Sequence, residues 1–125
     1  MNGRFHGKVA IVTGAASDIG RRVADRFFEE GATILAVDRN PKTLAELPQA
    51  AERWQPHLRD VAPKGASAPP IEACVARFGG LDVLANIAGV GDSKPAHDTS
   101  DEDFEYWINA NLSSTFRLFR DALLE

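Results

Sequence analysis

The chain has 125 residues, of which 44% are hydrophobic and 26% charged, and its formal net charge is -4. This length and composition are typical of one soluble globular domain, residues 1–125. The negative charge argues against nucleic acid or an anionic membrane surface as a partner, because both attract clustered Lys and Arg.

The sequence also lacks the features of membrane-spanning, secreted, disulfide-bonded and metal-binding proteins. It has no run of about 18 apolar residues that would cross a bilayer, and its N-terminus does not resemble a secretory signal. Cys74 is the only cysteine, so no internal disulfide can form and a reducing cytoplasm is the simplest setting. The histidines show no metal-ligand spacing with Cys74, so no metal site is expected.

Short apolar runs alternate along the chain with amphipathic or helix-prone stretches. The expected elements, in chain order, are a strand at 9–12, a helix at 19–30, a strand at 33–37, a short helix at 41–47, a strand at 54–58, a loop at 62–70, a helix at 71–78, a strand at 81–85 and a long helix from 100 to 125. The strands at 9–12 and 33–37 are apolar on both faces, as buried parallel strands are. The strand at 54–58 is weaker because it contains Pro56.

Strands and helices that alternate in this way predict a parallel sheet whose connections are right-handed crossovers. We expect an α/β fold with the strand order 3-2-1-4, which is half of a Rossmann-type doubly wound sheet. Such sheets bind ligands at the carboxyl ends of their strands, where the order reverses. The residues expected at those ends are Gly14, Asp38, Asp60 and Asn86.

The first strand–helix turn and the end of the second strand carry the signals of a dinucleotide site. Gly14 follows the strand and Gly20 opens the helix, whose free N–H groups and positive dipole end favour a pyrophosphate. Asp38 can accept both ribose hydroxyls and repels a 2′-phosphate, which favours NAD over NADP. Arg39 complicates the choice, because a nearby arginine can accept that phosphate. The alternative interpretation is that the glycines belong to an ordinary strand–helix turn and that Asp38 is a solvated residue at a strand end, with no ligand bound by either.

In order and spacing, these residues resemble the short-chain dehydrogenase/reductase family across essentially the whole chain. The resemblance rests on Thr13-Gly14 with Gly20, on Asp38, on Asp60-Val61, on Asn86-Ile87-Ala88-Gly89 and on Asn111. It implies a pyrophosphate lined by Gly14, Ser17, Ile19 and Gly20. It also implies that Asp38 holds the adenosine ribose and Asp60 the adenine amino group, with Val61 beside it. Asn86, Ala88 and Gly89 would lie beneath the cofactor ribose, and Asn111 matches the catalytic asparagine that holds a water in the proton relay.

Two positions in the matched region depart from the family pattern, which usually has glycine at position 18 and asparagine at position 87. Ile87 extends an apolar strand end. Asp18 either opposes the phosphate or acts as an N-cap whose oxygen accepts the N–H of Gly20 or Arg21, and we favour the cap. Asp18 and Arg39 complete the set of candidate cofactor-binding residues.

A larger departure is that the family's catalytic serine and Tyr-x-x-x-Lys are absent. Tyr106 is the only tyrosine, and Ala110 stands where the lysine would follow. Without them no acid protonates a carbonyl oxygen as hydride arrives. The sequence therefore looks like the truncated N-terminal half of an NAD(H)-dependent oxidoreductase that acts on a small alcohol or ketone, and residues 1–125 alone are expected to be inactive. The alternatives are a non-catalytic dinucleotide-binding module and a structural remnant that associates through its last helix.

Ser100 caps the last predicted helix, with Asp103 three residues on as a weak capping box. Apolar residues then recur at steps of three and four and are expected to cover the sheet. They are Phe104, Ile108, Leu112, Phe116, Phe119 and Leu123. Trp107, Leu118 and Ala122 fall on the flanks of this stripe, where we expect exposure to solvent. Apolar flanks beside an open sheet edge predict a homo-oligomer that forms through residues 100–125.

Overall fold

A parallel sheet forms the centre of the computed structural model, which describes residues 3–49 and 51–125. Its strands are β1 (Val9–Thr13), β2 (Thr33–Asp38), β3 (Trp54–Leu58) and β4 (Val83–Asn86). They lie in the order β3-β2-β1-β4, and all neighbouring pairs are parallel. The predicted strand order and the α/β, doubly wound fold are therefore confirmed.

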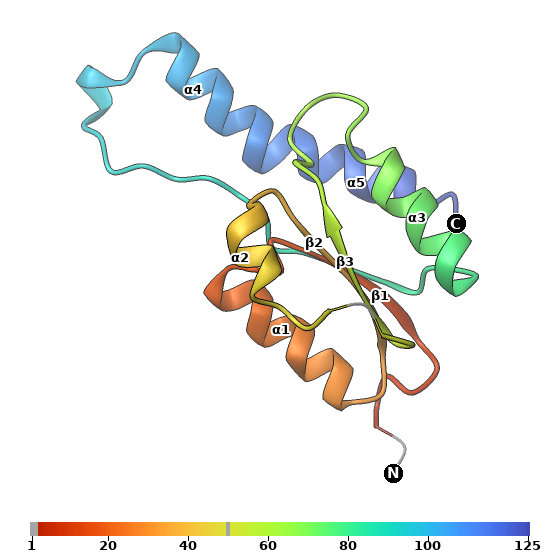
Figure 1. The fold of residues 1–125 in the computed structure, drawn as a ribbon. Helices are drawn as coiled ribbons and strands as arrows, with labels where there is room; N and C mark the ends of the chain where they lie inside the picture. Colours follow the sequence, from red (N-terminus) through yellow and green to blue (C-terminus); the bar gives the residue numbers. More distant parts are fainter. Residues whose placement is uncertain (1–2, 50) are drawn as a thin grey trace.

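Helices cover both faces of this sheet (Figure 1). The helical segments are α1 (Asp18–Glu29), α2 (Pro41–Ala45), α3 (Ala68–Phe78), the 3-10 turn η1 (Ala96–Asp98), α4 (Asp101–Ile108), the π-helical turn η2 (Asn109–Ser113) and α5 (Ser114–Ala122). α1 and α2 lie on one face, α3 and α5 on the other, and α4 extends beyond the sheet (Figure 1). None of the described helices is long and apolar enough to cross a membrane.

The two central strands are buried on both faces, because their side chains alternate between two cores. Ala10 and Val12 of β1 belong to the core beneath α1 and α2. Ile11, between them, belongs to the core beneath α3 and α5. All three side chains are fully buried, which explains why residues 9–12 form a continuous apolar run.

β3 forms one edge of the sheet and carries Pro56 in its middle, opposite Ala36 of β2. Proline has no N–H to donate to a neighbouring strand. An edge strand has a neighbour on one side only, so a residue whose N–H would face the open side can be a proline without loss of a hydrogen bond. Trp54, at the start of the strand, is buried in the core beneath α1 and α2. The weaker third strand that the sequence predicts is therefore confirmed.

α3 begins earlier than expected, because part of the predicted loop at 62–70 is helical. The helix starts at Ala68 and has Pro69 and Pro70 in its first turn. A proline in that turn costs no hydrogen bond, and its fixed φ suits a helix. Clustered prolines are therefore compatible with a helix start as well as with a loop.

The last helix turns a different face to the sheet from the one that the sequence predicts. Leu118, expected on an exposed flank, is fully buried in the core with Ile11. Ala110 and Ser114 are also buried and precede Leu118 at steps of four residues. Small side chains at these two positions allow the helix to lie close to the sheet, and the expectation for residues 100–125 is wrong on this point.

The predicted apolar stripe instead faces solvent. Its members are Phe104, Ile108, Leu112, Phe116, Phe119 and Leu123, all of them exposed. Phe116, for example, retains 63% of its accessible surface. Trp107 and Ala122 are half-buried. The sheet is thus covered by the helix face that carries Ala110, Ser114 and Leu118. The more apolar face of the helix is not covered by any of the described residues.

A π-helical turn, η2, separates α4 from α5. Such a turn adds a residue to the helical repeat, so the side chains that follow it are rotated relative to an unbroken α-helix. A stripe read at regular steps of three and four cannot anticipate that rotation. The start of the helix agrees with the prediction, because Ser100 and Asp103 form the expected capping box.

Candidate functional site

A cavity of about 350 Å³ opens at the carboxyl ends of the strands. This volume is within the range of small-molecule sites. Of the residues that the sequence proposes for a cofactor, those that line it are Gly14, Ser17, Asp38, Arg39, Asp60, Val61, Ala88 and Gly89. They come from the segments that follow β1, β2, β3 and β4, so the topology brings these four strand ends together.

Ser17, and not Asp18, is the N-cap of α1. Its backbone is extended, and its Oγ accepts the N–H of Gly20 at 3.2 Å. The Ser17 hydroxyl also donates to the Gly14 carbonyl at 2.6 Å, which fixes the turn that leads into the helix. Asp18 is the first residue of the helix and is exposed, so its carboxylate acts only as a charge near the positive end of the helix dipole. The predicted Asp18 cap is therefore wrong.

Gly20 closes this turn against Gly14. A Cβ at position 20 would lie 1.8 Å from the Gly14 carbonyl oxygen. Any residue but glycine would therefore clash with that oxygen. In the described part of the chain, the N–H groups of Asp18 and Ile19 enter no hydrogen bond. These two donors at a helix N-terminus are available to an anion.

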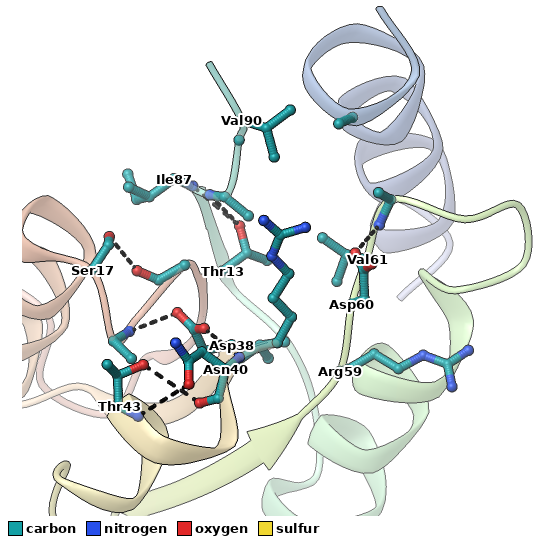
Figure 2. Close-up of a pocket in the computed structure, with 18 residues that line it drawn as sticks. Thr13, Ser17, Asp38, Asn40, Thr43, Arg59, Asp60, Val61, Ile87 and Val90 are labelled. Carbon is teal, nitrogen blue, oxygen red and sulfur yellow. Dashed lines mark hydrogen bonds between the residues drawn. The ribbon is translucent and has the colours of Figure 1, made fainter. Parts of the chain in front are cut away.

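Asp38, at the end of β2, joins two loops of the site (Figure 2). One carboxylate oxygen accepts the N–H of Ala16 at 3.0 Å, and the other accepts the N–H of Asn40 at 2.9 Å. Asn40 in turn caps α2 through the N–H of Lys42. Each carboxylate oxygen can accept a further hydrogen bond, so Asp38 is oriented by the protein and can still receive a ligand's hydroxyl groups.

The loop after β3 supplies an apolar wall with a polar rim. Val61 is buried, while Asp60 is exposed and accepts the N–H of Ala62 at 3.0 Å. The Ala62 carbonyl accepts hydrogen bonds from Asn109 and Arg117. These contacts fasten the loop to the last helix and hold Val61 against the cavity.

Thr13, the last residue of β1, organises the end of β4. Its hydroxyl donates to Asn86 Oδ1 at 2.8 Å and accepts the N–H groups of Ile87 and Ala88, both at 3.1 Å. Asn86 Nδ2 donates to the Thr115 hydroxyl at 2.7 Å. Both ends of the Asn86 side chain are thus used within the protein, and Asn86 supports the cavity without lining it.

Asn111 lies in the π-helical turn and clamps the loop after β4. Its Oδ1 accepts the Val90 N–H, and its Nδ2 donates to the Val90 carbonyl, both at 2.8 Å. A Cβ at position 89 would lie 2.7 Å from Asn111 Oδ1, so a larger residue there would make the Asn111 side chain shift. Asn111 does not line the cavity. In the described part of the chain, its side chain holds the loop after β4 in place.

Some predicted residues therefore stand outside the cavity wall. They are Asp18, Ile19, Gly20, Asn86 and Asn111. Other wall residues were not proposed for the site from the sequence, and these are Ala16, Val37, Asn40, Thr43, Arg59, Ala62, Val90 and Ala110. Most of the missed residues lie within a few positions of a predicted strand end, so the strand ends themselves were the available signal.

Other titratable groups lie outside this site. Cys74 is fully buried in the core beneath α3 and α5, and burial raises the pKa of its thiol to about 11, as is typical of an unreactive structural cysteine. His97 is exposed and lies 3.6 Å from Asp98. Among residues 3–49 and 51–125, no three His, Cys, Asp or Glu side chains are grouped so that they could hold a metal ion.

The fold and the arrangement of its strand ends define a Rossmann-like α/β domain. A family described as short chain dehydrogenase matches residues 8–125, and the chain belongs to this short-chain dehydrogenase/reductase family. Its resemblance extends over nearly its whole length to solved structures as well. One is a short-chain dehydrogenase/reductase from Brucella melitensis with a TM-score of 0.90 and 30% identity, which covers 99% of this chain and 54% of that one.

Curated relatives give the same family. A 3beta-hydroxysteroid dehydrogenase of Mediterraneibacter gnavus is 40% identical over 95% of this chain and 45% of its own length. A D-threitol dehydrogenase of Mycolicibacterium smegmatis is 38% identical over 90% of this chain and 45% of its own length. The chain therefore spans about half the length of the curated relatives that it matches.

Proposed function

We propose that the chain binds NAD in the cavity at the strand ends, as the cofactor-binding part of an oxidoreductase. The observation that carries this proposal is that a helix N-terminus with free N–H groups begins at the edge of a cavity lined by an oriented carboxylate. The N–H groups of Asp18 and Ile19 enter no hydrogen bond in the described part of the chain and directly follow Ser17, which lines the cavity. The oriented carboxylate of Asp38 lines the same cavity. Donors of this kind suit a pyrophosphate, and a carboxylate acceptor suits the hydroxyls of a ribose.

The residues present fit such a cofactor. Gly20 adds no side chain where the first turn of α1 packs against Gly14, so this position does not hinder a pyrophosphate from approaching the backbone. Val61 supplies an apolar surface for the adenine, and Asp60 stands beside it as an acceptor for the amino group. Ala88 presents only a methyl group, and Gly89 no side chain, beneath the position of the second ribose.

NAD, when bound, would accept or supply the hydride in an alcohol–carbonyl reaction. The 125 residues contain no Tyr-x-x-x-Lys, since Ala110 follows Tyr106 at that spacing. We therefore propose that these residues bind and orient the dinucleotide without turnover, and that any substrate is a small alcohol or ketone. Loss of a general acid or base typically costs ~10²–10⁴-fold in rate. The alternative is a dinucleotide-binding module that has no reaction of its own.

Calorimetric titration with NAD and with NADP tests the binding proposal. We expect tighter binding of NAD, because a 2′-phosphate would lie near the Asp38 carboxylate, and we expect Asp38→Ala to reduce that preference. Tighter binding of NADP would show that Arg39 outweighs Asp38. Binding of neither cofactor would contradict the proposal. Robust NADH production from an alcohol by the purified 125-residue chain would contradict the absence of turnover.

The lone, buried Cys74 favours a reducing compartment, and we propose a cytoplasmic location on that ground. We also propose self-association through residues 100–125, although the face involved differs from the predicted flanks. The exposed stripe that Phe104 begins and Leu123 ends is the apolar surface available for it.

A further inference from the structure

Two arginines, Arg39 and Arg59, line the cavity that would hold the dinucleotide. Arg59 is engaged elsewhere, because its Nε donates to the Ala66 carbonyl at 3.3 Å. Figure 2 shows the Arg59 side chain directed away from Asp38. Arg39 is therefore the cation that can act at the ribose edge of the cavity.

Arg39 follows Asp38 directly in the chain, yet in the described part of the structure it forms no ion pair with that carboxylate. The Asp38 oxygens instead accept backbone N–H groups. The guanidinium of Arg39 donates to the hydroxyl of Tyr106, 67 residues further along the chain in α4, at 3.4 Å. The Tyr106 hydroxyl is the largest cause that raises the pKa of Arg39 above its ordinary value, and the charges of Asp60 and Asp38 add to it.

We propose that Tyr106 is a positioning residue for cofactor preference: by holding Arg39 toward α4, it keeps the guanidinium away from the place beside Asp38 where a 2′-phosphate would lie. This inference rests on the proposed binding of a nicotinamide dinucleotide. Arginine is well suited to a phosphate, because its planar guanidinium forms paired, charge-assisted hydrogen bonds. Released from Tyr106, Arg39 has the reach to make them, since its backbone adjoins Asp38. Tyr106 is the only tyrosine of the sequence, and in this proposal its role is to position Arg39 and not to transfer a proton.

Calorimetric titration of the full chain with NAD and with NADP tests this through the ratio of the two dissociation constants. Tyr106→Phe removes only the hydroxyl, and we expect it to shift that ratio toward NADP by ~10-fold, the effect of one charge-assisted hydrogen bond. In an Arg39→Ala background the same Tyr106→Phe change should leave the ratio where Arg39→Ala alone places it. Phe104→Leu, an exposed aromatic on the same helix, is the matched control and should not move the ratio.

The outcomes separate this inference from the proposed function. If NAD binds and Tyr106→Phe leaves the ratio unchanged, the role of Tyr106 is wrong while the binding site stands. An equal shift in the presence and absence of Arg39 also overturns the inference, because Tyr106 would then act without the guanidinium. If neither dinucleotide binds the unaltered chain, both proposals fail together.

Discussion

At the scale of single residues, the start of α1 depends on one hydroxyl. Ser17 Oγ accepts the Gly20 N–H and donates to the Gly14 carbonyl, whereas the Asp18 carboxylate makes no hydrogen bond within the described residues. We expect Ser17→Ala to lower the free energy of unfolding by ~1 kcal/mol, as the loss of an N-cap does. Asp18→Ala should cost less, ~0.5 kcal/mol or below, because only its interaction with the exposed helix dipole is lost.

Urea unfolding of both variants measures these differences. A larger loss for Asp18→Ala than for Ser17→Ala would show that the aspartate is the cap after all. The sequence could not decide between the two residues, because serine and aspartate are equally good caps. The choice depends on where the turn from Gly14 leaves the extended backbone, and that turn is fixed by contacts of Gly20 with Gly14.

Gly89 is a second position where one atom decides the structure. A Cβ there would lie 2.7 Å from Asn111 Oδ1, so Gly89→Ala must shift the Asn111 side chain and weaken its two hydrogen bonds with Val90. We expect a loss of ~1–3 kcal/mol of unfolding free energy. Gly91→Ala is the matched control, because nothing lies within 4 Å of its added Cβ. Thermal melts measure the effect. An equal drop in melting temperature for both substitutions would contradict the close approach of Gly89 to Asn111.

At the scale of elements, the sequence predicted most of the sheet and misplaced the last helix. Buried parallel strands are apolar on both faces, so β1 and β2 were recognisable from residues 9–12 and 33–37 alone, and their ends marked Gly14 and Asp38. Leu118 was misplaced because the most apolar stripe of a helix need not face its own sheet. The face that carries the small residues at 110 and 114 packs against the sheet instead and brings Leu118 into the core.

The end of α1 is tied to the N-terminal segment by an ion-pair cluster that should respond to pH. Glu30 accepts hydrogen bonds from Arg4 and forms an ion pair with Arg26 at 2.9 Å. The Arg4 side chain, chiefly through its hydrogen bond, lowers the pKa of Glu30 to about 2. A carboxyl whose pKa is lower in the folded state stabilises the fold above its unfolded pKa, and this contribution is lost as the pH falls toward the folded value.

Glu30→Gln should therefore lower the melting temperature at pH 7, and the difference from the unaltered chain should shrink as the pH falls from 4.5 toward 2. Thermal melts across this range measure the effect. Glu29→Gln is the control, because the exposed Glu29 forms no ion pair within the described residues. A difference that grows with acidity would contradict the role of Glu30.

At the scale of the whole molecule, an uncovered apolar face predicts association. Phe104, Leu112 and Phe116 are exposed on one side of α4, η2 and α5, and burial of each phenylalanine would contribute ~1.5–3 kcal/mol before the costs of association. Light scattering should show a dimer or larger species that Phe116→Glu weakens. Leu58→Glu, an exposed leucine on β3, should have no such effect. A monodisperse monomer at high micromolar concentration with a cooperative melt would contradict this expectation.

The central claim, that a dinucleotide binds where the four strands end, is tested most directly by hydrogen exchange of the full chain with and without NAD. We expect slower exchange in peptides that cover residues 13–20, 38–43, 60–62 and 86–90, because these segments surround the cavity. Exchange at the far ends of the strands, in residues 29–33 and 79–82, should not change, since those segments lie away from the cavity. Unchanged exchange around the cavity at saturating NAD, or slower exchange confined to segments away from it, would contradict the account.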